Sequence, residues 1–174
     1  MNRWTKFALT ILAPVSVAIA LPASDAFAQQ KSLKEQLVGT WMLVSSTSIR
    51  PDGTKIDLYG PDPKGIVIYT SDGHFALLNT RADLPKLAAN NRARASAEEA
   101  RAVVAGSIAY FGAYLLNEVE KVITVKVEGS TFANMIGGAE QKRIITSLTA
   151  DELKFINSRT PSGVTLEVVW KRAK

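Results

Sequence analysis

The chain of 174 residues contains no cysteine and a single histidine, His74. Without cysteine there is no disulfide, no thiolate metal ligand and no N-terminal cysteine for lipid attachment. With one imidazole, a metal site built mainly from histidines is excluded as well. Acidic residues remain at 57–62, but their spacing matches no calcium loop. We therefore expect neither a metal nor another cofactor.

His74 is the one candidate for histidine-based catalysis. It follows Ser71-Asp72-Gly73, a turn sequence, so a water-exposed turn residue is one interpretation and a general base is the other. A serine hydrolase would have to use His74, and no Gly-x-Ser-x-Gly elbow accompanies it. We assign no catalytic residue from the sequence.

Basic runs are absent, although Lys and Arg outnumber Asp and Glu by 21 to 16. The positive charges are scattered along the chain, which argues against a nucleic-acid-binding surface. The formal net charge of +5 is compatible with a weak attraction to anionic surfaces.

Residues 1–28 have the three parts of a secretory signal peptide. Two basic residues precede an apolar run at 7–21, and Ala-Phe-Ala at 26–28 places small residues where a signal peptidase cleaves. The alternative is an uncleaved anchor, but the run is shorter than the ~20 residues that span a bilayer and contains Pro14. We expect cleavage after residue 28, export to the periplasm or the medium, and no stable membrane insertion.

Residues 29–174 predict one domain composed mostly of β-strands. Short segments of alternating apolar and polar residues recur from Leu37 to Lys171, and the Ser71-Asp72-Gly73 turn between two of them indicates a hairpin. The pattern favours about 8–9 antiparallel strands but does not distinguish a sandwich from a barrel. An alanine-rich insertion, at about 81–107, contains Ser96-Ala97-Glu98-Glu99, which is typical of a helix start.

Both ends of this domain resemble lipocalins. Gly39-Thr40-Trp41 is similar to the Gly-x-Trp of that fold, in which the tryptophan plugs the closed end of a barrel beneath a basic side chain from the last strand. Arg172, near the end of the last predicted strand, matches that basic residue. The resemblance implies that Arg172 covers Trp41 through a cation–π contact.

Longer stretches resemble the bacterial and fungal lipocalin-like domain family in order and spacing. They are LVGTWMLVS, GPDPKGIVIYTSDGHF, AYFGAY, VEGS, RIITSLTADELKF and the terminal VVWKR. The resemblance implies a lipocalin-like up-and-down β-barrel with one helical insertion. Family members often carry histidines in the strand that here reads Thr124-Val125-Lys126, so any role tied to those histidines is absent from this chain.

Aromatic residues supply the apolar part of a candidate ligand site. Tyr69 and Phe75 flank the hairpin turn, and Tyr110 and Tyr114 share one face of a later strand with Gly112 between them. One interpretation is ordinary core packing. The other is that the tyrosines face a cavity, where their hydroxyls orient the polar end of a ligand and Gly112 leaves room for it.

Gln141 belongs to the polar part of the candidate site, and Glu128 and Arg143 supply its charges. If both point inward from adjacent strands they would pair, because an isolated buried charge is costly. The pair would then be structural, or Arg143 would receive a ligand carboxylate through its planar guanidinium.

Three functions are consistent with these observations. The favoured hypothesis is a carrier or sensor of a small lipophilic molecule held in the barrel. An isomerase or cyclase using Glu128, Arg143 or a tyrosine is the second, and a pocket carboxyl with a raised pKa would distinguish it. The third is an envelope interaction protein with a filled barrel. The insertion at 81–107 is a candidate lid over the barrel mouth.

Overall fold

The computed structural model describes residues 31–158, 160 and 164–174. The predicted signal peptide, residues 1–28, lies outside these residues. The helices and strands of the described chain are, in order, α1 (Leu33–Leu37), β1 (Gly39–Ile49), β2 (Lys55–Asp57), β3 (Lys64–Tyr69), β4 (His74–Thr80), η1 (Arg92–Arg94), α2 (Ala97–Gly106), β5 (Ser107–Asn117), β6 (Val122–Ser130), η2 (Ala133–Met135), β7 (Gln141–Leu148), β8 (Glu152–Asn157) and β9 (Thr165–Arg172).

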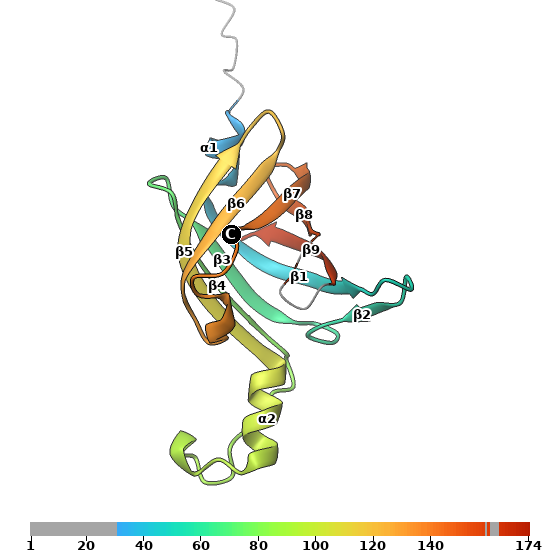
Figure 1. Cartoon of the computed structure of the whole chain (residues 1–174), viewed down its shortest axis with the longest axis vertical. Helices are drawn as coiled ribbons and strands as arrows, with labels where there is room; N and C mark the ends of the chain where they lie inside the picture. Colours follow the sequence, from blue (N-terminus) through green and yellow to red (C-terminus); the bar gives the residue numbers. More distant parts are fainter. Residues whose placement is uncertain (1–30, 159, 161–163) are drawn as a thin grey trace, which may run out of the picture. The chain divides into compact units, whose positions relative to one another are not determined.

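Eight of these strands close into an antiparallel barrel (Figure 1). The strand order is β1-β3-β4-β5-β6-β7-β8-β9, and β9 pairs again with β1, from Trp41↔Arg172 to Ile49↔Thr165. This last pairing removes the sheet edges, so the architecture is a barrel and not a sandwich. The predicted number of strands, the up-and-down order and the hairpin between β3 and β4 are confirmed.

Two short elements depart from the sequence prediction. Helix α1 was not predicted from the sequence. It begins with a capping box, in which the Ser32 side chain accepts from the Glu35 amide and the Glu35 carboxylate accepts from the Ser32 amide. Strand β2 pairs with the last residues of β1, where β3 no longer does.

The predicted helical insertion contains α2 and η1 and connects β4 to β5. Ser96 and Glu99 form the expected capping box at the start of α2, which ends at Gly106. The Glu99 carboxylate also accepts from the Ala88 amide, at 2.7 Å. Figure 1 shows α1 at one end of the barrel and α2 beyond the other.

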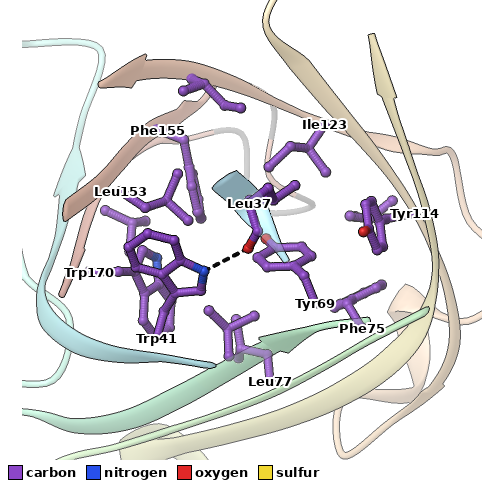
Figure 2. Packing of buried hydrophobic residues seen from close by; sticks show 14 of the residues in the cluster. Leu37, Trp41, Tyr69, Phe75, Leu77, Tyr114, Ile123, Leu153, Phe155 and Trp170 are labelled. Carbon is purple, nitrogen blue, oxygen red and sulfur yellow. Dashed lines mark hydrogen bonds between the residues drawn. The ribbon is translucent and has the colours of Figure 1, made fainter. Parts of the chain in front are cut away.

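The barrel end that α1 covers is organised around Trp41. This side chain is fully buried, and its indole Nε1 donates to the Leu37 carbonyl at 2.9 Å (Figure 2). The Arg172 guanidinium lies 4.0 Å from the centre of the Trp41 ring, which is the contact that the resemblance implied. Arg172 also donates to the carbonyls of Gln36, Val38 and Ala150, so one side chain joins α1, the start of β1 and the β7–β8 turn.

Gly39 is required by this arrangement. Its φ is +131°, and a Cβ at this position would lie 2.8 Å from Nη1 of Arg172. The glycine and the arginine therefore belong to one packing unit, although they stand at opposite ends of the domain in sequence.

The interior of the barrel changes character along β1. Trp41 and Leu43 point inward near α1, and Figure 2 shows the apolar residues that pack around them. A bulge between Leu43 and Ser45 then shifts the register with β9. Beyond the bulge, the buried residues of β1 are Ser46 and Ser48. The barrel is thus apolar at the α1 end, and polar side chains enter its interior from about the middle.

We expect Arg172→Ala to lower the free energy of unfolding by about 2–4 kcal/mol, because it leaves three carbonyls without their charged donor and uncovers Trp41. Urea unfolding of the variant, followed by tryptophan fluorescence, measures this loss. Lys171→Ala is the matched control, since Lys171 is exposed on the neighbouring position. Equal losses in the two variants would contradict a special role for Arg172.

Candidate functional site

A cavity of about 290 Å³ occupies the half of the barrel away from α1. This is room for roughly ten water molecules at ~30 Å³ each. Its wall comes from six strands and its mouth from the loops after β2, β6 and β8. The described residues that line it are Ser46, Leu58, Tyr59, Leu77, Asn79, Ile108, Tyr110, Phe132, Met135, Gln141, Arg143, Phe155, Asn157, Thr160, Val164, Leu166, Val168 and Trp170.

Buried polar residues of the described chain concentrate at this cavity. Five of the six line it, and these are Ser46, Asn79, Gln141, Arg143 and Asn157. Of the five, Arg143 and Gln141 were predicted for the polar part of the site. Asn79 and Asn157 could also have been found from the sequence. Asn79 follows Phe75 and Leu77 at every second position of β4, so it points inward as they do. Asn157 follows Leu153 and Phe155 in the same way on β8. A polar residue in an inward position of a barrel strand therefore marks the cavity.

Arg143, on β7, is the central polar residue, with 1% of its surface exposed. Nη1 donates to the Tyr69 hydroxyl at 2.8 Å, and Nη2 donates to the Tyr110 hydroxyl at 2.9 Å. The guanidinium carbon also lies 5.2 Å from the Phe75 ring centre and 5.3 Å from that of Phe155. Tyrosine hydroxyls and aromatic faces thus hold the cation in place.

The charge of Arg143 has no anionic partner among the described residues. No carboxylate lies within ion-pair distance of it, and no other charged side chain of the described chain lines the cavity. Desolvation alone would lower the pKa of Arg143, but the two tyrosine oxygens outweigh it and the pKa is raised. Among the described residues, the positive charge of Arg143 at the cavity is therefore permanent and uncompensated.

Three further polar atoms at the cavity are buried without a hydrogen-bond partner in the described chain. They are Oδ1 of Asn79, Oδ1 of Asn157 and Nε1 of Trp170. A buried polar group without a partner costs about 1–3 kcal/mol, so its occurrence in a folded protein calls for an explanation. All three belong to residues that line the cavity, but the atoms themselves are covered by protein, and Oδ1 of Asn79 lies over Gly65.

The predicted aromatic site residues divide into two groups. Tyr110 lines the cavity, whereas Tyr69, Phe75 and Tyr114 belong to the buried core. Tyr114 donates its hydroxyl proton to the Thr70 carbonyl at 2.7 Å, and its ring meets that of Tyr69 edge-on at 5.1 Å. Tyr69 and Phe75 act on the cavity indirectly, because they hold Arg143.

The predicted pair between Glu128 and Arg143 does not form. Glu128 is exposed on the outer face of β6, while Val127 next to it points inward. The alternation of Ile123, Val125 and Val127 along this strand requires that orientation. Arg143 is satisfied by two tyrosines instead of an acid.

Gly112 also has a different role from the predicted one. It lies at a bulge between β5 and β6, where a Cβ would come within 2.0 Å of the Lys126 carbonyl oxygen. The glycine makes room for the neighbouring strand and not for a ligand.

The mouth is formed by loops other than the predicted lid. No described residue of 81–107 lines the cavity. Leu58 and Tyr59 come from the β2–β3 connection, Phe132 and Met135 from η2 and its start, and Thr160 from the β8–β9 connection. The side chains around the mouth are thus mainly apolar, and those deeper in the cavity include Arg143.

The described part of the chain offers few side chains for acid–base catalysis or metal binding at the cavity. The lining contains no His, Asp or Glu there. His74 is exposed at the β3–β4 turn, with Nδ1 3.2 Å from Oδ1 of Asp72. No group of three or more potential metal-ligating side chains lies together within the described residues. A search of the same residues finds no helix with the length and apolar character needed to cross a membrane.

Eight antiparallel strands in up-and-down order, closed at one end and hollow toward the other, define a lipocalin-type barrel, a fold that suggests ligand binding. The family model described as Lipocalin-like domain matches residues 38–173, and the chain belongs to that family. No curated protein matches the chain in sequence.

The chain is also similar, at low sequence identity, to solved structures from a bacterium and from protein design. A lipocalin-like protein from Bacteroides uniformis is 15% identical over 79% of this chain and 99% of that chain, with a TM-score of 0.42. Another protein from Bacteroides uniformis is 14% identical over 83% and 94%, with a TM-score of 0.44. A redesigned β-barrel is 15% identical over 83% and 100%, with a TM-score of 0.44.

The buried tyrosines predict a stability loss at alkaline pH. Burial raises the pKa of Tyr59 to about 12, with a further increase from Tyr110 and a partial offset by Asn79. A raised folded-state pKa contributes stability that is complete below the ordinary value of about 10 and is lost as the pH rises through 12. Urea unfolding at a series of pH values from 9 to 12 should show this fall, and Tyr59→Phe should make it shallower. An unchanged slope in the variant would contradict the assignment.

Proposed function

We propose that this protein binds and carries a small, largely apolar molecule in the cavity of its barrel. The observation that carries the proposal is the cavity itself, about 290 Å³ in volume, inside the closed barrel. Its wall is mainly apolar and includes a small number of polar side chains, which is the usual composition of a small-molecule site. A ligand that fills the cavity would cover this apolar wall.

The dimensions of the cavity favour a ligand of modest size. Its volume of about 290 Å³ lies at the lower end of the ~300–1,000 Å³ that small-molecule sites span. Aliphatic and aromatic side chains such as Leu77, Phe155, Leu166 and Val168 provide the wall. A medium-length aliphatic chain or a single substituted ring meets both conditions.

The alternative functions receive less support. An isomerase or cyclase was expected to show a pocket carboxyl with a raised pKa, but no described carboxylate lines the cavity. Acid–base work would fall to Tyr59 and Tyr110 alone. An interaction protein with a filled barrel conflicts with the hollow half of the interior. Exposed Val104 is the main apolar side chain that α2 offers to a partner.

We also propose that the carrier acts outside the cytoplasm. The support is the order of charged, apolar and small residues in 1–28. Removal of residues 1–28 takes away Arg3, Lys6 and Asp25, so the formal charge falls from +5 to +4.

Filling the cavity should abolish binding. We expect the purified wild-type protein to retain a small molecule and Leu77→Trp to lose it, because the indole occupies the space of the ligand. Native mass spectrometry of the purified protein, followed by organic extraction, measures occupancy. Leu78→Trp is the matched control, because Leu78 lies on the same strand but is 45% exposed on the outer face, against 6% for Leu77.

Retention of the molecule by Leu77→Trp would place the ligand elsewhere. Overpacking can cost about 1–3 kcal/mol, so both variants are first checked for cooperative unfolding. A wild-type protein that carries nothing and takes up no aliphatic or aromatic probe would refute the proposed function.

Export is tested separately by the N-terminus of the protein recovered from its final compartment. We expect Gln29 as the first residue, because the Ala-Phe-Ala sequence at 26–28 directs cleavage there. Intact-mass measurement of the recovered chain gives the result. Ala28→Leu should slow cleavage, and recovery of the uncleaved chain from the cytoplasm would contradict export.

A further inference from the structure

The positive charge of Arg143 limits which ligand the cavity can hold. The side chain is 1% exposed, and the described lining contains no other charged group. Tyr69 and Tyr110 solvate the guanidinium with neutral oxygens but do not neutralise it. A buried cation without a counter-charge is costly, whereas a bound anion would both neutralise it and gain a strong attraction in a medium of low dielectric constant.

A hydrogen-bond donor next to this charge lacks an acceptor. Tyr110 accepts from Arg143, and no described residue accepts the proton of its own hydroxyl. Both residues line the cavity. A ligand group that only accepts hydrogen bonds, such as a carboxylate, complements this donor.

Charge balance favours a carboxylate over a phosphate. One arginine in the described lining is matched by one negative charge, whereas a phosphate monoester carries about −1.5 to −2 at neutral pH and would leave the cavity negative. Asn157 stands opposite Arg143 in the register of β7 and β8. The Asn157 amide has both donors and an acceptor. Rotation of this amide would therefore direct its NH2 group toward a bound carboxylate.

We infer that the ligand is a small monocarboxylate, bound with its carboxylate at Arg143 and Tyr110 and its apolar part toward the mouth. This inference rests on the proposed function, because it specifies the molecule held in the same cavity. The orientation follows from the lining: Phe132 and Met135 stand at the mouth, and Arg143 lies deep and shielded from water. The carboxylate end of the ligand therefore enters the cavity first and lies deepest.

The test compares three compounds that share one eight-carbon chain and differ only in the polar group at its end. Isothermal titration calorimetry measures the binding of octanoate, octanamide and 1-octanol. The full-length mature protein is first freed of bound molecules by organic extraction, and the buffer contains no chloride. We expect octanoate to bind at least tenfold more tightly than either neutral compound, because only the carboxylate meets the buried charge. Equal affinities for the acid and the alcohol would overturn the carboxylate inference and leave the proposed function intact. Binding of none of the three would overturn the carboxylate inference, and with the same result for uncharged aromatic probes it would also remove the proposed function.

Variants assign the selectivity to Arg143. Arg143→Met should remove the preference for octanoate over octanol, while Lys142→Met, which deletes an exposed cation from the neighbouring position, should keep it. If Arg143→Met does not fold, Tyr110→Phe decides: loss of its hydroxyl should reduce the preference several-fold without changing octanol affinity. Full preference in Tyr110→Phe or in a folded Arg143→Met protein would overturn the assignment.

Discussion

The pairing of β1 with β9 is the constraint on which the remaining structure depends. It joins the first and last strands of the barrel over most of β1, from Trp41 to Ile49. Without it, the sheet would have two open edges and its interior would be a face exposed to water. With it, the inward side chains of eight strands share one enclosed volume. The contact between Arg172 and Trp41 stands at the end of this seam and fixes where the closed end begins.

The interior of the closed barrel has two parts, one filled by side chains and one hollow. The part beneath α1 is filled by Trp41, Tyr69, Trp170 and their neighbours, and its role is stability. The part beyond it is hollow and contains most of the buried polar side chains. Arg143 lies at the boundary, since its partners Tyr69 and Phe75 belong to the filled part while Tyr110 belongs to the hollow one.

Much of the fold was predictable because strand alternation and turn chemistry are local. The β3–β4 hairpin, the capping box of α2 and the pairing of Trp41 with Arg172 all follow from short motifs or from the family resemblance. The closure of the barrel was not predictable from the pattern, because a sandwich has the same alternation. Within the site, Arg143 and Tyr110 were predicted as cavity residues, but Asn79 and Asn157 were not. Recognising them requires knowing which face of each strand is interior over the full length of the strand. Glu128 shows the converse: its place in the alternation already assigned it to the outside.

The bulge in β1 separates the two halves of the interior in a further sense. Before it, odd-numbered residues such as Trp41 and Leu43 point inward; after it, even-numbered ones such as Ser46 and Ser48 do. Insertion or deletion of one residue at the bulge would therefore exchange the inner and outer side chains of the distal half alone, leaving the plug in register. A change of register at this single point would thus replace the β1 side chains that face the hollow half of the interior and leave Trp41 and Leu43 in place.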